Sequence, residues 1–138
     1  MRSIRKSTML AASIAAGLLT ILPGGVANAA PVSESYPECE LFFDAPRVIN
    51  GKVGFTGGAK CPPTSSANVT WLMVWLTPHH DAPYKEWVGE KRGAAKTHTA
   101  GSTVPCVSGK YQGSVFASLY GDKGVDHITV DTTATITC

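Results

Sequence analysis

Apolar and polar residues alternate with a period of two over most of this chain, which is the pattern of β-strands with one face in a core. The alternation is cleanest over 128–138, where one parity is mainly apolar and the other consists of threonines and an aspartate. Over 111–119, tyrosine, glycine, valine, alanine and leucine share one parity in the same way. Both segments are therefore predicted to be strands that pack one face against a core.

The segment 69–76 differs, because it is apolar at nearly every position. Such a run predicts a central strand that is covered on both faces. Two shorter segments, 40–43 and 84–90, predict further strands. After residue 30 no segment carries a convincing helical stripe, and only 89–101 leaves room for one short helix.

Six to eight strands joined by glycine- and proline-rich turns predict an all-β fold, a small antiparallel β-sandwich of immunoglobulin-like or barrel-like form. Internal repeats and long linkers are absent from the sequence, so 38–138 is expected to form a single domain. The segment 31–37 has no apolar periodicity and is expected to be a flexible leader.

The first thirty residues have the three parts of a secretory signal peptide. Arg2, Arg5 and Lys6 form a basic start, 10–22 is an apolar run, and 27–29 reads Ala-Asn-Ala, the small-x-small pattern of a cleavage site. The apolar run is too short to cross a membrane core. We therefore expect 1–30 to be cleaved and the mature protein to be secreted into an extracellular, oxidising environment.

Removal of the signal changes the charge of the protein. The full chain has 12 basic and 10 acidic residues, for a net charge of +2. Three of the basic residues and none of the acidic ones lie in 1–30, so 9 basic and 10 acidic groups remain, a net charge of about −1. Nucleic-acid binding needs an excess of cations, and membrane spanning needs a long apolar stretch. The mature chain is therefore expected neither to bind nucleic acid nor to be a membrane protein.

The four cysteines are expected to form two disulfides, each closing its own hairpin. Asn50-Gly51 favours a type I′ turn, and in a hairpin closed there the facing residue numbers add to 101. Cys39 and Cys61 add to 100, one residue from facing each other. A single bulge at Pro46 or at Gly57-Gly58 would close that gap and predicts the pair Cys39–Cys61.

The second pair follows from a second turn. A loop over 121–123 would place Cys106 opposite Cys138, which predicts that disulfide. The alternative is an immunoglobulin-type bond between Cys61 and Cys106, packed against a tryptophan. The tyrosine expected two residues before the second cysteine of that arrangement is absent, since Val104 stands there.

The cysteine order resembles that of the small secreted α-amylase inhibitors of actinomycetes. The likeness covers the bonded pairing, first with second and third with fourth, and a cysteine near the C-terminus. It implies a β-sandwich with two consecutive hairpin-type disulfides. The Trp-Arg-Tyr contact triad of that family has no match, because no tryptophan here is followed by arginine. The family's target is therefore not carried over.

One segment, 78–87, combines aromatic and titratable side chains with two restricting prolines. Its candidate binding residues are His79, His80, Asp81, Tyr84 and Trp87. The two imidazoles and the carboxylate, with His98 or His127, could begin a zinc site. Adjacent histidines on an extended chain point in opposite directions, however, so no metal and no cofactor is expected. Trp87 and Tyr84 have a second interpretation, as core residues of the following strand. Lys91, Arg92 and Lys96 form a mild basic patch, usually a solvated face.

The chain lacks a GxSxG elbow, its cysteines are assigned to disulfides, and no pair of carboxylates stands apart from ordinary surface charge. It is therefore expected not to be an enzyme. The working hypothesis is a secreted, non-enzymatic binding protein with an extracellular protein partner. In its most specific form, the protein is an inhibitor of an extracellular hydrolase. The alternatives are an accessory subunit or effector of a secreted antibacterial complex, and a cell-wall or glycan-binding module. The glycan module would use exposed tryptophans and Tyr84 as sugar platforms.

Overall fold

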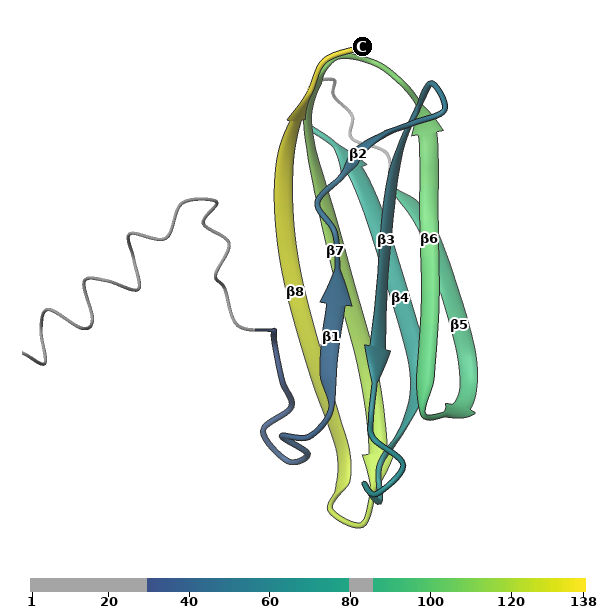
Figure 1. Ribbon diagram of the computed structural model, residues 1–138, viewed down its shortest axis with the longest axis vertical. Helices are drawn as coiled ribbons and strands as arrows, with labels where there is room; N and C mark the ends of the chain where they lie inside the picture. Colours follow the sequence, from purple (N-terminus) through teal and green to yellow (C-terminus); the bar gives the residue numbers. More distant parts are fainter. Residues whose placement is uncertain (1–29, 80–85) are drawn as a thin grey trace, which may run out of the picture.

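The computed structural model describes residues 30–79 and 86–138, and within them it contains eight strands and no helix. The strands are β1 (Glu40–Phe43), β2 (Arg47–Ile49), β3 (Lys52–Lys60), β4 (Asn68–Pro78), β5 (Trp87–Ala95), β6 (Thr97–Pro105), β7 (Gly109–Gly121) and β8 (Gly124–Ile136). They form two antiparallel sheets packed face to face (Figure 1).

Sheet A contains β1, β2, β3 and β6. Strand β6 pairs with β3 along its whole length, and β1 and β2 follow one another along the other edge of β3. Sheet B has the order β5-β4-β7-β8. The predicted all-β sandwich is confirmed, and the two separate sheets follow the immunoglobulin-like order rather than a closed barrel. The short helix considered within 89–101 is wrong, since strands β5 and β6 occupy that segment.

The core lies between the two sheets and is built from alternate residues of β3, β4 and β7. In β7 the buried parity runs from Tyr111 to Leu119, as the period-two pattern predicts. The sheets approach closely where the strands carry glycine. A Cβ placed on Gly113 of β7 would lie 2.5 Å from the ring of Phe55 on β3, so only glycine leaves room for that ring.

The first disulfide, Cys39–Cys61, is confirmed, together with the turn that predicted it. Asn50 and Gly51 both have positive φ angles, 51° and 76°, as a type I′ turn requires. Facing residues add to 101 between β2 and β3 and to 100 between β1 and β3. The extra residue lies within 44–46, so the segment with Pro46, rather than the glycine pair, takes up the shift.

The second disulfide, Cys106–Cys138, is also confirmed, although the expected turn is wrong by one residue. Gly121 pairs with Gly124, which leaves a two-residue turn at 122–123 instead of a loop over 121–123. The facing residues of β7 and β8 add to 245, whereas Cys106 and Cys138 add to 244, and the segment 106–108 before β7 makes up this difference of one residue. The first disulfide lies where β3 ends and the second beside the C-terminus, so the two bonds clamp opposite ends of the sandwich (Figure 1).

The segment 31–37 was expected to be a flexible leader, but it packs on the domain. Tyr36 and Ser33 are each only 1% exposed, and Val32 forms a β-bridge with Glu40. The Ser33 hydroxyl donates a hydrogen bond to the carboxylate of Asp126, about ninety positions away in the sequence. A single buried aromatic residue makes no periodic pattern along the chain, so this packing could not be predicted from the alternation of apolar and polar residues.

The Tyr36 hydroxyl completes this attachment. It donates to the carbonyl oxygen of Gly124 at 2.6 Å and accepts a hydrogen bond from the backbone N–H of Lys123 at 2.8 Å. The ring supplies buried apolar area while its polar end is fully paired, the usual arrangement for a buried tyrosine. The β7–β8 turn is thereby joined to the segment 31–37.

Candidate functional site

The expectation that 69–76 is covered on both faces is wrong, because one face of this strand is buried and the other is only partly buried. On β4, Leu72, Val74 and Leu76 are fully buried between the sheets. Trp71 and Trp75, with Met73 between them, point the other way and are only partly buried. Strand β4 is central within its sheet, as predicted, but no second layer from the described residues covers its outer side.

Other strands add apolar side chains to this outer face of sheet B. Met73 pairs across to Phe116 on β7, and Trp75 pairs across to Val88 on β5. Val88, Tyr120 and Val125 are 51%, 59% and 59% exposed. The apolar members of the outer face are Trp71, Met73, Trp75, Val88, Phe116, Tyr120 and Val125. Single exposed apolar residues are ordinary, whereas a contiguous set on one face is typical of an interaction surface.

A row of ring contacts crosses the outer face from one edge to the other. The guanidinium carbon of Arg92 on β5 lies 4.2 Å from the centre of the Trp71 ring. The Trp71 and Phe116 rings meet edge to face, with centres 5.6 Å apart, and Phe116 is followed by His127 on β8 at 5.2 Å. All four strands of sheet B therefore contribute one side chain to the row.

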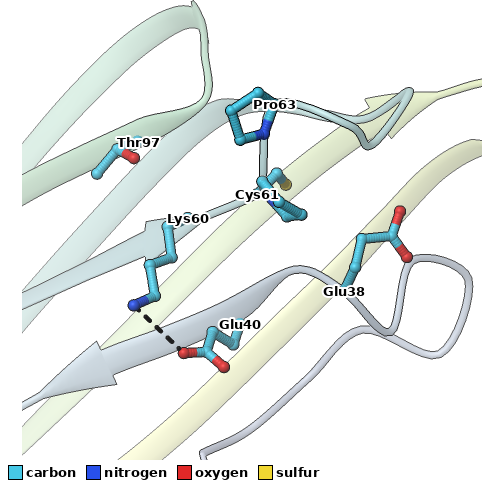
Figure 2. A pocket seen from close by; sticks show the side chains of 7 residues that line it. Glu38, Glu40, Lys60, Cys61, Pro63 and Thr97 are labelled. Atoms are coloured by element: carbon cyan, nitrogen blue, oxygen red, sulfur yellow. Dashed lines mark ion pairs between the residues drawn. The ribbon is translucent and has the colours of Figure 1, made fainter.

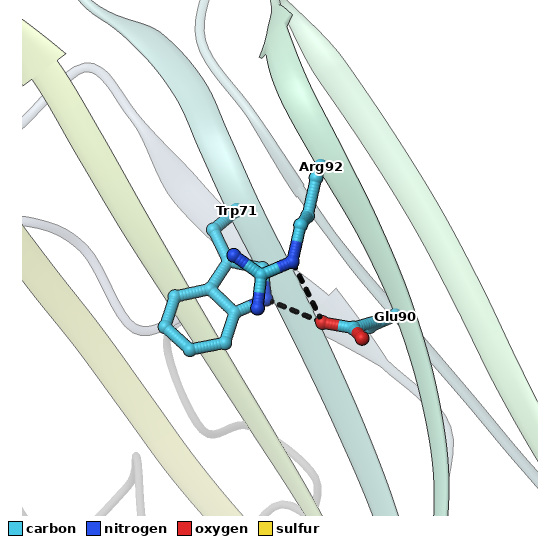
Figure 3. A network of polar contacts seen from close by, with 3 residues as sticks. All are labelled: Trp71, Glu90 and Arg92. Carbon is cyan, nitrogen blue, oxygen red and sulfur yellow. Dashed lines mark hydrogen bonds and ion pairs between the residues drawn. The ribbon is translucent and has the colours of Figure 1, made fainter.

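Glu90 fixes the β5 end of this row (Figure 3). Its Oε2 atom accepts a hydrogen bond from the indole Nε1–H of Trp71 at 2.8 Å and forms an ion pair with Nε of Arg92 at 3.3 Å. One carboxylate oxygen thus holds both the indole and the guanidinium that stacks on it. Arg92 was expected in a simple basic patch with Lys96, but Lys96 instead donates to backbone carbonyls of the segment after β3.

Sequence reasoning missed the roles of Glu90, Arg92 and Phe116. A signal was present, because Val88, Glu90 and Arg92 alternate with a period of two and so share one face of a strand. The alanine and lysine content of 89–101 instead left room for a short helix, despite the glycines that bracket it. Phe116 shares its parity with the polar residues Gln112, Ser114 and Ser118, so the alternation along its strand predicts no role for it.

The predicted binding segment 78–87 is only partly described. His80, Asp81 and Tyr84 lie outside the described residues. His79 is exposed at the end of β4, where its backbone N–H donates to the carbonyl of Lys110 at 2.8 Å. Trp87 opens β5 opposite Leu76 and packs against the core, which is the second of its two interpretations.

The two histidines considered as further metal ligands lie apart. His98, on β6 of sheet A, contacts the carbonyl oxygen of Gly93 through Nε2 at 2.5 Å. His127 belongs to the outer face of sheet B. Within the described part of the chain, no group of three or more His, Cys, Asp or Glu side chains is arranged to hold a metal ion.

A shallow cavity of about 410 Å³ lies beside the Cys39–Cys61 disulfide (Figure 2). Its lining includes Glu38, Glu40 and Lys60. Glu40 forms an ion pair with Lys60 at 3.5 Å, while the Glu38 carboxylate points away from that pair and accepts a hydrogen bond from Ser65. That bond lowers the pKa of Glu38, whereas a general acid needs a raised one. The cavity therefore gives no support to acid–base chemistry.

None of the described residues forms a helix with the length and apolar character needed to span a membrane. The two disulfides are typical of a protein that folds in an oxidising, extracellular compartment.

No protein-family model and no curated protein matches the chain. Several solved structures are distantly similar to it. The chain is similar to AggA, the major subunit of aggregative adherence fimbriae type I from Escherichia coli, with 14% identity, a TM-score of 0.47, and coverage of 72% of this chain and 94% of that one. It is also similar to OgpA from Akkermansia muciniphila, solved with an O-glycopeptide substrate, with 17% identity and a TM-score of 0.44.

The OgpA match covers 80% of this chain and only 32% of OgpA. A third similarity, to the sporulation control protein Spo0M of Bacillus subtilis, has 14% identity, a TM-score of 0.36, and coverage of 80% of this chain and 51% of that one. The three proteins named here differ in kind, and the similarities are too distant to carry an argument about function.

Proposed function

We propose that this chain is a secreted, non-enzymatic binding domain that contacts an extracellular protein through the outer face of sheet B. The observation that carries the proposal is the row of Arg92, Trp71 and Phe116, with Trp75 and Met73 beside it, which no residue of 30–79 or 86–138 covers with a second layer. Tryptophan, tyrosine, phenylalanine, methionine and arginine are the residue types enriched in protein interfaces, while lysine is depleted. Tryptophan, tyrosine and arginine also dominate their binding energies.

The rigidity of this surface supports the same function. The outer face is formed by four hydrogen-bonded strands, and disulfides clamp both ends of the sandwich. A surface that is ordered before it binds loses little conformational entropy on association. A protein partner also suits the face better than a glycan, because Arg92 stacks on the Trp71 ring that a sugar platform would leave open.

The more specific form of the proposal is that the chain inhibits a hydrolase. This form is supported by the position of the outer face, which extends to the end of the domain where His79 is exposed. The pair Trp75–Val88 on the outer face lies next to the ends of β4 and β5, between which the segment 79–86 runs. A target that contacts the outer face at this end also meets the exposed His79. His79 and the outer face would then act as one binding surface.

The second candidate, a subunit of a secreted complex, rests on β8. This strand runs from Gly124 to Ile136 and pairs only with β7 among the described residues. Its other edge offers backbone donors and acceptors to a strand from a partner. The docked segment 31–37 occupies the start of that edge through Asp126, which shortens the length on offer.

The test is affinity capture from culture medium with the mature protein and two variants. The double variant Met73→Thr/Trp75→Thr changes the outer face, and Val48→Thr changes an exposed apolar residue of sheet A as the matched control. The proposal expects a partner that the wild type and the control retain and that the outer-face variant loses. A recovered hydrolase whose activity falls on binding supports inhibition.

Two results would contradict the proposal. One is a partner that all three proteins retain equally. The other is turnover of ester, peptide or glycoside substrates that is lost when His79 and His80 are replaced by alanine together, because such turnover would make the chain an enzyme.

A further inference from the structure

We propose that Arg92 is a carboxylate-binding residue, which receives an acidic side chain of the protein partner at the β5 end of the outer face. The inference rests on the proposed function and adds to it the chemistry of one contact. It is carried by the way Trp71 and Glu90 hold the guanidinium (Figure 3).

Two contacts fix the guanidinium plane. One of its faces lies on the Trp71 indole, with the guanidinium carbon 4.2 Å from the ring centre, and its Nε is paired to Glu90 at 3.3 Å. A stacked arginine held at Nε has little rotational freedom left in its planar group. Planar, pre-oriented guanidinium groups are the form in which arginine binds carboxylates through two parallel hydrogen bonds.

The donors needed for that contact are not used within the described part of the chain. A guanidinium carries five N–H donors, of which four belong to the two terminal nitrogens. The one polar contact of Arg92 with the described residues is made through Nε, and its side chain is 65% exposed. Glu90 meanwhile divides its Oε2 between Trp71 and Arg92, so it does not occupy the terminal nitrogens.

The local charge favours a contact at short range over long-range attraction. Glu90 offsets the charge of Arg92 on the outer face, and Lys91, which pairs with the buried Leu72, has the opposite parity on β5. The chain after residue 30 carries about one net negative charge, so its overall field does not attract polyanions. A single carboxylate that hydrogen-bonds the terminal nitrogens of Arg92 therefore suits this site better than an extended acidic polymer.

The neighbours of Arg92 indicate that the carboxylate is borne by a polypeptide. Trp71 and Phe116 continue the row away from Arg92, and Met73 lies beside them. This apolar area complements the apolar residues that flank an acidic side chain in a protein segment. A uronic acid would instead bring hydroxyl groups that need hydrogen-bonding partners on either side of the carboxylate.

The test is a titration of the ¹⁵N-labelled mature protein, followed by the NMR signals of the Trp71 indole N–H and the Arg92 side chain. The probe is a capped tripeptide with glutamate between two leucines, and its counterpart has glutamine in place of glutamate. We expect saturable shifts of both signals with the glutamate peptide, and binding about tenfold weaker or more with the glutamine peptide.

Three variants complete the design. Arg92→Gln is expected to weaken binding of the glutamate peptide about tenfold or more. Arg92→Lys keeps the charge but loses the planar guanidinium, and it is expected to weaken binding by a smaller factor. Lys91→Gln removes the same charge from the adjacent exposed position and is expected to leave binding within about twofold, since a surface charge without direct contact is screened. Circular dichroism confirms that each variant is folded.

Defined outcomes overturn the inference. Equal binding of the two peptides, an equal loss with Lys91→Gln, or absence of shifts removes the carboxylate site. Shifts with a glucuronate-containing disaccharide but not with the peptide assign the site to a glycan instead. Failure of this inference is distinguishable from failure of the proposed function, because capture by the outer face can persist in Arg92→Gln while the peptide titration shows no carboxylate contact.

Discussion

The aromatic ring of Phe55 fills the space beside Gly113, so that β3 of one sheet and β7 of the other meet without a side chain on the second strand. A Cβ on Gly113 would lie 2.5 Å from the ring, and Phe55 is only 2% exposed, which leaves the ring no free direction. This contact sets how closely the two sheets approach at the centre of the core.

Gly113→Ala is therefore expected to destabilise the domain. Overpacking of a close-packed core typically costs about 1–3 kcal/mol, more than the gain from a less flexible unfolded chain. Urea unfolding followed by tryptophan fluorescence measures the change, and Ser114→Ala on the outer parity of the same strand is the control. A Gly113→Ala variant as stable as the wild type would contradict the close approach of Gly113 to the Phe55 ring.

Tyr36→Phe tests whether the segment 31–37 is part of the folded domain. The variant keeps the buried ring but leaves the carbonyl of Gly124 and the N–H of Lys123 without their partner. Loss of a buried partner costs about 1–3 kcal/mol, so the unfolding midpoint should fall. Tyr120→Phe, in which the ring is 59% exposed, should leave the midpoint unchanged. Equal midpoints for wild type and Tyr36→Phe would mean that this segment adds nothing to stability.

Local signals account for what the sequence predicted correctly. Period-two alternation marks β7 and β8, and Asn50-Gly51 marks the first hairpin, because each depends only on neighbours along the chain. The disulfides follow from those registers. The second turn was misplaced by one residue because Gly121 and Gly124 bound a two-residue turn as readily as they flank a longer loop.

Nonlocal contacts account for what the sequence could not show. Trp71 and Trp75 are apolar, and nothing along β4 says whether a further layer covers them. Tyr36 docks through backbone atoms almost ninety positions away. The Glu90–Arg92 arrangement depends on the pairing of β5 with β4, which places Arg92 opposite Trp71. Each feature is fixed by which strands become neighbours, and that is a property of the whole fold.

The attachment of Ser33 also predicts a dependence of stability on pH. The Ser33 hydroxyl, followed by the backbone N–H of Ser35, stabilises the ionised carboxylate of Asp126 and lowers its pKa below the ordinary value. A carboxyl with a lowered folded-state pKa contributes stability above the unfolded-state pKa of about 4 and loses it as pH falls through the folded value. Acidification below about pH 4 should therefore weaken the domain.

Asp126→Asn isolates that contribution. Urea midpoints measured at neutral pH and at several acidic values should fall less steeply below about pH 4 in the variant than in the wild type. Asp131→Asn, which changes an exposed carboxylate on the same strand, is the control and should keep the wild-type slope. Identical slopes for wild type and Asp126→Asn would show that the Ser33 contact does not favour the ionised form.

Removal of either disulfide should destabilise the domain without changing which strands pair. The bonds close loops with sequence separations of 22 and 32 residues, for which chain entropy gives about 3–4 kcal/mol each. The double variants Cys39→Ser/Cys61→Ser and Cys106→Ser/Cys138→Ser should lose similar amounts in urea unfolding, the second slightly more because its loop is longer. Peptide mapping of unreduced wild-type protein is the control for the pairing. A bond between Cys61 and Cys106, or free thiols at these positions, would contradict a sandwich clamped at both ends, and the rigidity argued for the outer face would lose its basis.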